Sequence, residues 1–279
     1  MQFFHQNRFY SFRVDANAMG GFLEEPLPKH IPTVAPVSLP AVGGFATARS
    51  EGFNLDDIVS CSCAYTKVSG TEHRADGSIS ILTTAVVEDL DILEVVTAER
   101  IVAQLSVSIP RGVSDPQISL VGSRFEGLRL AGRHRQPTLN AALNPPGTGP
   151  GGHGLPLTWQ NVQQAGQSQA KKLIERFKAC GDKDADRWAQ KRHGWMAVDP
   201  LPENGGKLLC SLVDGFDGEQ SNKSCGHIVE IPGFGRIFLG ELWVLPNSVQ
   251  LVAIRAELGC PVKGKVGVCA VGGGGSGEN

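Results

Sequence analysis

The sequence predicts a mainly β protein: an antiparallel, sandwich-like or stacked-repeat β domain with one helical insertion, α+β overall. The first observation is composition, because 35 glycines and 17 prolines among 279 residues indicate many turns and short strands. The second is order along the chain. β-branched, alternating segments come first, one amphipathic segment follows, and alternating segments return after Pro200. Regular βαβ alternation is absent, which favours an antiparallel sheet.

The third observation is a seven-residue pattern that occurs three times in the first half of the chain. Each copy has a glutamate followed by a small or acidic residue, a large apolar residue, a polar residue and an aliphatic one. The copies are RSEGFNL at 49–55, VVEDLDI at 86–92 and RFEGLRL at 124–130. This repeat predicts similar β units, each with a strand entry at the pattern. Because equivalent positions in repeats usually do the same structural job, we expect Glu51, Glu88 and Glu126 to pair with a neighbouring arginine or a strand-end amide.

The first half of the chain is predicted to form the body of the sheet. Loose alternation with four aromatic residues predicts an opening strand over residues 2–14. Five prolines between Pro26 and Pro40 predict extended or edge segments, because proline lacks the amide donor of a central strand. Turn signals such as Ser-Gly and Asp-Gly then separate alternating segments. These predicted strands cover residues 58–68, 77–87, 93–109 and 117–130.

The middle of the chain is predicted to be helical. Thr158 is a suitable N-cap, apolar residues recur from Trp159 to Phe177 at steps of three and four, and Cys180-Gly181 is a suitable end. A second, shorter helix is predicted around residues 184–192. Strands then resume over residues 207–213, 227–231, 236–245, 249–258 and 262–271.

These elements divide the chain into five parts. The predicted parts are a β-rich repeat half at 1–132, a Gly/Pro-rich linker at 133–158, a helical insertion at 159–195, C-terminal strands at 196–271 that complete the β domain, and a disordered tail at 272–279. We expect no signal peptide and no transmembrane segment, since no apolar run has the necessary length. The sequence predicts no particular cellular compartment.

Charge argues against a polyanionic partner. The chain has 26 basic and 28 acidic residues, so any role with nucleic acid or an anionic membrane would have to be local. One local excess exists, with eight basic and four acidic residues between Lys171 and Arg192. A solvated helix face is the better interpretation, and nucleic-acid binding is the unfavoured alternative.

The cysteines and histidines offer one candidate metal site. Cys61-Ser62-Cys63 lies in a predicted strand, where residues two apart face the same side, and Cys225-Gly226-His227 has the same step. If those strands paired, Cys61, Cys63, Cys225 and His227 could hold a tetrahedral zinc ion. Buried thiols or a single disulfide are the favoured interpretation of the seven cysteines, because free cysteine is commonly buried. No cofactor is therefore predicted, with zinc as the alternative.

Several segments resemble the bacterial choice-of-anchor P family. The resemblance lies in TAVVEDLDI at 84–92, VTAERIVA at 96–103, SRFEGLRLAG at 123–132 and VEIPGFGRIFLGE at 229–241. It implies a β-rich, surface-displayed protein with variable sorting signals and no assigned chemistry, and it brings no functional residues. The chain differs from that family in its helical insertion and in showing neither leader nor anchor.

The predicted function is a non-catalytic structural or assembly protein. The sequence contains neither Gly-x-Ser-x-Gly nor His-Glu-x-x-His, so no hydrolase or metalloprotease signature supports an enzyme. Strands with small polar residues on one face and aliphatic residues on the other can join at their edges, which predicts a homo-oligomer. The alternative is a zinc-dependent enzyme or hydrolase that uses the Cys and His strands.

Overall fold

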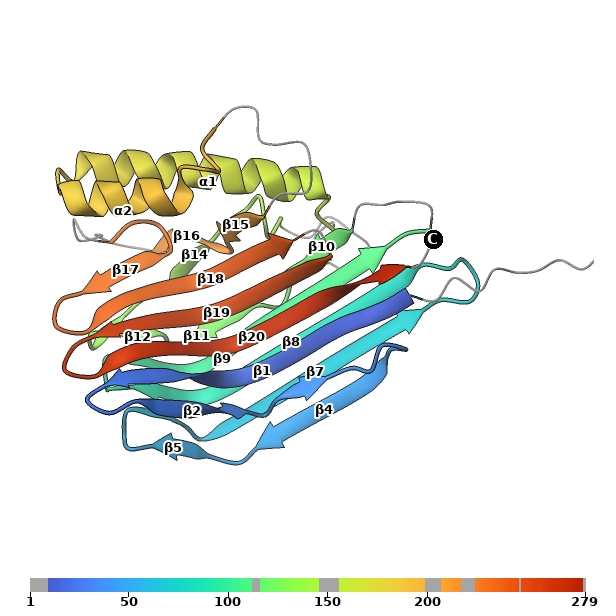
Figure 1. Cartoon of the computed structure of the whole chain (residues 1–279), viewed down its shortest axis with the longest axis horizontal. Helices are drawn as coiled ribbons and strands as arrows, with labels where there is room; N and C mark the ends of the chain where they lie inside the picture. The colour runs from blue at the N-terminus through green and yellow to red at the C-terminus, as the bar shows by residue number, and fades with distance from the viewer. Residues whose placement is uncertain are drawn as a thin grey trace, which may run out of the picture.

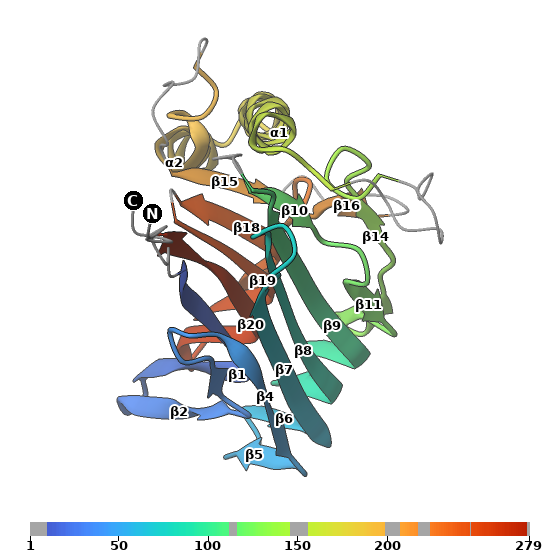
Figure 2. The ribbon, with the colours of Figure 1, turned by 90° about the vertical axis from the view of Figure 1, so that its right-hand side faces the viewer.

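Two antiparallel sheets pack face to face as a sandwich, and two helices lie at one end of it (Figure 1, Figure 2). The computed structural model describes residues 10–111, 116–145, 156–198, 207–216, 224–245 and 247–277. The predicted fold class, mainly β with a helical insertion, is confirmed. Residues 2–9 of the predicted opening strand and 146–155 of the predicted linker lie outside the described residues.

Sheet A brings the beginning and the end of the described chain together. Its order is β15-β18-β19-β20-β1-β2, with β17 also on β18 and β3 also on β1. The strands are β1 (Tyr10–Glu25), β2 (Lys29–Val34), β3 (Val37–Ser38), β15 (Leu208–Ser211), β17 (Ile228–Ile231), β18 (Gly235–Leu245), β19 (Ser248–Gly259) and β20 (Lys263–Gly277). β1 pairs with β20 from Tyr10 opposite Gly277 to Glu25 opposite Lys263. The N-terminal and C-terminal parts of the chain therefore build one sheet.

Sheet B is built from the repeat half. Its order is β13-β12-β9-β8-β6-β5, with β10 and β11 also on β9, β7 on β8, and β4 on β7. The strands are β4 (Gly44–Ser50), β5 (Phe53–Leu55), β6 (Val59–Cys61), β7 (Cys63–Glu72), β8 (Ile79–Ile92), β9 (Val96–Ile109), β10 (Gln117–Ser119), β11 (Arg124–Glu126), β12 (Arg129–Leu130) and β13 (Arg133–His134). A separate pair joins β14 (Pro137–Leu139) to β16 (Val213–Phe216), so part of the predicted linker is a strand.

The threefold sequence repeat is a bend followed by a hairpin tip. The residue after each glutamate has a positive φ: Gly52 at 87°, Asp89 at 50° and Gly127 at 63°. Five and six residues after each glutamate, two successive residues again have positive φ, which is the geometry of a type I′ turn. These pairs are Asp56 and Asp57, Leu93 and Glu94, and Ala131 and Gly132. The expected strand entry is present in the first and third copies, where β5 begins at Phe53 and β12 at Arg129, but the second copy lies within β8. What all three copies share is the bend and the turn that follows it.

The three tips lie next to one another in sheet B. Val59 on β6 is opposite Ile92 on β8, and Leu130 on β12 is opposite Val96 on β9. The aliphatic residue that ends each pattern therefore occupies the same level of the sheet in neighbouring hairpins. The three sequence repeats therefore form neighbouring hairpins within one sheet and do not form separate stacked domains.

The main core lies between the two sheets. Inward-facing residues such as Met19 on β1, Leu105 on β9 and Ile254 on β19 are fully buried. The alternation that predicted these strands places every second residue in this layer. Each fully buried aliphatic side chain contributes about 1.5–3 kcal/mol relative to an exposed one.

The glycine-rich end of the chain is a central strand, and the prediction of a disordered tail from residue 272 was wrong for residues 272–277. β20 runs to Gly277 between β19 and β1. A Cβ on Gly273 would lie 3.1 Å from Cγ2 of Ile81 and 3.4 Å from Cγ2 of Val107 in sheet B. A Cβ on Gly274 would lie 2.2 Å from the carbonyl oxygen of Asn247. Glycine is needed here because two neighbouring backbones and the opposite sheet approach closely.

The two helices form as predicted. Helix α1 (Trp159–Ala179) begins with a capping box, in which Oγ1 of Thr158 accepts from the Asn161 amide and Oδ1 of Asn161 accepts from the Thr158 amide. It ends at Cys180, before Gly181 with a φ of 73°. Helix α2 (Lys183–His193) is capped by Asp182. In the described part of the chain, neither helix combines the length and apolarity that crossing a bilayer requires.

Helix α1 closes the β15 edge of sheet A. A Cβ on Gly166 would lie 3.2 Å from Cδ1 of Leu208, so the helix approaches the strand closely. The buried Gln169 side chain accepts from the Ser211 amide at 2.7 Å and donates to the carbonyl oxygens of Ser211 and Val213 at 3.2 Å. These bonds satisfy backbone groups that an edge strand would otherwise expose.

Candidate functional site

The four candidate zinc ligands are not brought together. β6 and β7 belong to sheet B, whereas Cys225 and His227 precede β17 in sheet A, and β17 pairs with β18. The condition for the predicted site, pairing of the two strands, is therefore not met. No group of three or more His, Cys, Asp or Glu residues among the described residues is placed to hold a metal ion.

Cys61 and Cys63 do not face the same side, as the two-residue step suggested. Cys61 is buried in the core, and burial raises the pKa of its thiol to about 11. Cys63 is partly exposed and lies opposite Glu88. The strand breaks between them at Ser62, whose hydroxyl donates to Oδ2 of Asp89 at 2.6 Å. The break coincides with the repeat bend at Asp89. The alternation of inward-facing and outward-facing side chains is therefore interrupted between Cys61 and Cys63.

A buried polar cluster under α2 is the most unusual feature of the interior. We call it the α2 cluster: Arg192, His193, His227, Glu241 and Arg255. Glu241, on β18, is completely buried. Its Oε1 lies 2.5 Å from Nη2 of Arg192 and 3.0 Å from Nη2 of Arg255, and its Oε2 lies 2.5 Å from Nε of Arg255. One helix and two strands thus meet on a single carboxylate.

The arginines of the α2 cluster are also held by aromatic rings. The guanidinium carbon of Arg255 lies 3.7 Å from the ring centroid of Phe238, and that of Arg192 lies 4.8 Å from the same centroid. Arg255 forms a further ion pair with Glu257. Cation–π contacts of this kind are stronger when water is excluded. The cluster therefore combines charge pairing with packing.

Glu241 is a carboxylate in the folded protein. Burial alone would raise its pKa, but the hydrogen bonds from Arg255 and the positive charges of Arg255 and Arg192 outweigh burial and hold the pKa below its usual range. Both of its oxygens accept guanidinium hydrogen bonds. A general base must reach the proton that it removes, and this group is fully buried and already occupied. Its chemistry is that of an anchor for α2.

The two histidines of the α2 cluster are neutral, and within the described part of the chain their rings have no hydrogen-bond partner. His193 ends α2 and His227 precedes β17, each is 1% exposed, and their ring centroids lie 6.4 Å apart. Among the described residues, none of the four ring nitrogens has a hydrogen-bond partner. Burial chiefly lowers the pKa of His193 to about 3 and that of His227 to about 4. For His193, the neighbouring His227 and Arg192 lower it further.

Of the five residues in the α2 cluster, only His227 was predicted from the sequence to lie in a functional site. A signal for it exists, because Glu241 and Arg255 each interrupt an otherwise apolar strand, in Phe-Leu-Gly-Glu-Leu-Trp and Val-Ala-Ile-Arg-Ala. A charged residue at a core position is rarely buried unless it is paired. The pairing itself depends on α2, which no local pattern identifies.

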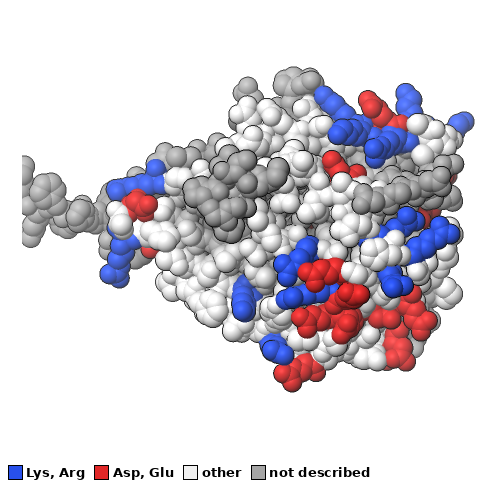
Figure 3. Space-filling model, turned by 180° about the vertical axis from the view of Figure 1, so that it is seen from behind, with Lys and Arg blue, Asp and Glu red and all other residues white. Residues whose placement is uncertain are grey.

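The three repeat glutamates lie on or between strands of sheet B, whose outer face carries many acidic and basic side chains (Figure 3). Each forms an ion pair with an arginine: Glu51 with Arg49 at 3.5 Å, Glu88 with Arg100 at 3.6 Å and Glu126 with Arg124 at 2.5 Å. Their side chains are between 38% and 81% exposed, so they do not converge on a pocket. Exposed pairs of this kind contribute about 0–1 kcal/mol each.

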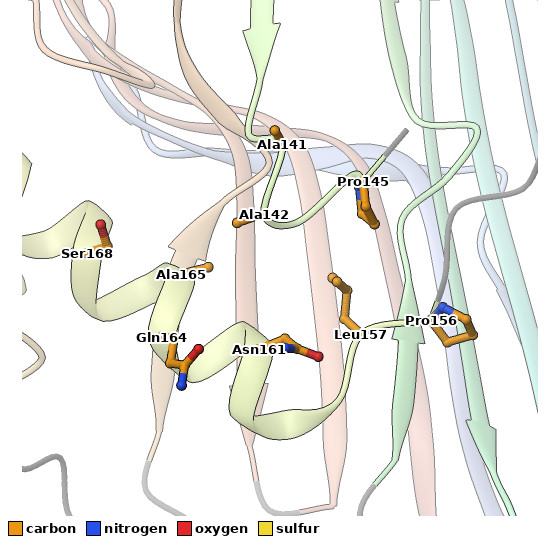
Figure 4. Close-up of a pocket in the computed structure, with 9 residues that line it drawn as sticks. All are labelled: Ala141, Ala142, Pro145, Pro156, Leu157, Asn161, Gln164, Ala165 and Ser168. Atoms are coloured by element: carbon orange, nitrogen blue, oxygen red, sulfur yellow. The ribbon is translucent and has the colours of Figure 1, made fainter. Parts of the chain in front are cut away.

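A surface groove of about 500 Å³ lies beside the first turns of α1 (Figure 4). Its walls come from the segment after β14, the segment before α1, and α1 itself. The lining residues are Ala141, Ala142, Pro145, Pro156, Leu157, Asn161, Gln164, Ala165 and Ser168. None of these side chains titrates near neutral pH, so the lining offers no acid–base pair.

The edges of the two sheets differ in how they are protected. The β15 edge is covered by α1, and β2 carries Lys29 and Pro32, which discourage pairing with another strand. The strands that pair with the outer side of β9, which are β10, β11 and β12, are three residues long or shorter. β4 has seven residues and no proline, and among the described residues it pairs with β7 alone. Phe45, near its start, is 68% exposed, and the preceding Val42 is 85% exposed.

The comparisons identify a family without a known role. Residues 9–245 match the model of a family described as Domain of unknown function (DUF8256). No curated protein and no solved structure matches the chain. The resemblance to choice-of-anchor P proteins is not tested by this match and stays a prediction.

Proposed function

We propose that this chain, which belongs to the DUF8256 family, is a non-catalytic structural protein that assembles with copies of itself through edge strand β4. The observation that carries the proposal is the contrast between edges: β4 is the one described edge strand of this length without a proline, a covering helix or a break. An unprotected edge of this kind offers a row of backbone donors and acceptors to another strand.

The residues of β4 favour antiparallel pairing with a second copy. If Thr47 of one copy lies opposite Thr47 of the other, Ala46 faces Ala48 on the inner side of the sheet. Phe45 then faces Arg49 on the outer side. This contact occurs twice across the twofold axis, and an arginine over an aromatic ring is attractive. The same register keeps the two arginines apart, so charge does not oppose pairing.

Phe45→Lys is expected to weaken self-association at least tenfold. The change removes two cation–π contacts, worth about 0.5–1 kcal/mol each at exposed sites, and places like charges opposite each other. Sedimentation velocity over a range of protein concentrations measures the dissociation constant. The double variant F45K/R49E is expected to recover association, because lysine then faces glutamate.

Leu82→Lys provides the matched control for Phe45→Lys. Leu82 is 43% exposed on the same face of sheet B, with Ser69 between it and Phe45, but it lies away from the edge. Its replacement should leave the dissociation constant unchanged. A wild-type chain that stays monomeric at every concentration would contradict the proposal, and so would equal effects of the two lysine variants.

A further inference from the structure

The last turns of α1, which end at an exposed cysteine, pack against a turn that contains a buried one. Cys180 is the exposed C-cap of α1, and Cys225 is the 3% exposed residue that starts the turn before β17. Cys225 belongs to one apolar cluster with Leu173 and Phe177 of α1. A Cβ on the next residue, Gly226, would lie 3.2 Å from Cδ2 of Leu173, so helix and turn are in close contact.

Helical geometry directs Cys180 towards the same turn. Cys180 keeps right-handed helical backbone angles, with φ of −67° and ψ of −14°. It therefore follows Arg176 and Phe177 by four and three residues on one face of the helix. Phe177 packs in the same apolar cluster as Cys225, and Arg176 is close enough to act on the Cys225 thiol. Burial raises the pKa of Cys225 to about 11, the Arg176 charge opposes this rise, and the negative charge of Cys180 adds to it.

We propose that Cys180 and Cys225 form a reversible disulfide bond that fastens the end of α1 to the start of β17. The reaction needs an external oxidant, and a low-molecular-weight disulfide is the class that fits an exposed first thiol. The Cys180 thiolate attacks one sulfur of that disulfide and releases the other as a thiol. Cys225 then gives up its proton and attacks the Cys180 sulfur, which releases the second thiol. Two protein thiols are oxidised and one external disulfide is reduced.

The bond would tie down the helical insertion. It closes a loop that contains α2 and β15, so it restrains the unfolded chain around the elements that form the α2 cluster. Oxidation should accordingly raise the midpoint of thermal unfolding, and dithiothreitol should reverse the rise. The inference does not depend on assembly through β4, since the cysteines lie on the helix side of sheet A.

The test treats the full, reduced chain with glutathione disulfide at neutral pH and maps it by mass spectrometry without reduction. Trypsin cleaves on both sides of each cysteine, so the bond would join peptide 179–183 to peptide 224–236. We expect this linked pair as the main product. A chain that accumulates glutathione on Cys180 while Cys225 stays free would overturn the proposal, as would a bond from Cys225 to any other cysteine.

Single variants distinguish Cys180, which reacts first with the external disulfide, from Cys225, which then attacks the Cys180 sulfur. Cys225→Ser should leave Cys180 as a stable glutathione adduct, because no second thiol can displace it, and Cys225→Ala should do the same if serine disturbs the buried turn. Cys180→Ser should leave Cys225 unmodified, because burial protects it. Cys260→Ser, at a partly exposed cysteine elsewhere, is the matched control and should leave the linked pair in full yield.

Discussion

Replacing Glu241 by glutamine is expected to lower the free energy of unfolding by about 3–5 kcal/mol. The amide keeps the shape of the side chain but leaves Arg192 and Arg255, which both bond to this carboxylate, without its charge. An unpaired buried charge is far more costly than the pair itself is stabilising. Urea unfolding followed by tryptophan fluorescence measures the loss, since Trp188 lies beside Phe238 at the edge of the cluster.

Glu230→Gln is the matched control for Glu241→Gln. Glu230 pairs with Arg236 at 3.2 Å, but both side chains are partly exposed, at 33% and 23%. Water can solvate the arginine left behind, so the expected loss is about 0–1 kcal/mol. Equal losses in the two variants would show that Glu241 is not the anchor that its burial indicates.

Replacing Arg192, Glu241 and Arg255 together by apolar residues tests whether the cost comes from the unpaired charge. Met at positions 192 and 255 and Leu at 241 keep much of the packing on Phe238 and remove every charge together. Such replacements of buried ion groups are often neutral or stabilising by about 1–4 kcal/mol. The triple variant should therefore be clearly more stable than Glu241→Gln alone.

Stability is expected to fall as the pH drops below about 6.5, the ordinary histidine pKa. In the unfolded chain His193 and His227 bind a proton near that value, whereas in the folded protein burial lowers their pKa values to about 3 and about 4. The unfolded state therefore binds more protons over this range, which favours unfolding. At pH 5 the cost is about 2 kcal/mol for each histidine.

Glu241 also makes the protein less stable as the pH falls, but it does so at lower pH than the histidines. Its folded pKa lies below the ordinary glutamate value of 4.5, so its stabilisation is complete above that value and is lost as pH falls further. A decline that begins between pH 6.5 and 5 thus reports the histidines. Unfolding curves from pH 8 to 4 measure it.

Variants of the two histidines identify the source of the acid effect. Phenylalanine at position 193 or 227 should remove about half of the decline between pH 7 and 5. At pH 7 it should cost little, because the ring nitrogens that it removes have no partner among the described residues. Exposed His134→Gln should change nothing. A flat stability curve between pH 7 and 5 for the wild-type chain would refute this account.

Local sequence signals predicted most of the strands and both helices. Alternation was sufficient for β8 and β9 because both are long and have one buried face. Thr158 and Gly181 were sufficient for the ends of α1 because capping is a local interaction. These are cases in which local preference and tertiary structure agree.

The errors share one physical cause, which is contact between distant segments. Residues 272–277, five glycines and Ser276, have no local preference for a strand. They form one because β1, β19 and sheet B leave room only for hydrogen at some of these positions. The face of Cys63 depends on the bend that accompanies Asp89. Glu241 could be noticed as a lone charge, but its arginine on α2 could not be assigned from sequence.

The pairing of β1 with β20 has a consequence for how the molecule folds. These strands lie at opposite ends of the described chain, and together they occupy the middle of sheet A. During synthesis sheet B can be complete before β20, the partner of β1, has left the ribosome. Such long-range pairing slows folding, because the entropy of closing a long loop is lost before the stabilising contacts form. A nascent chain that stops before β20 would expose both β1 and β19, and would be a natural substrate for chaperones.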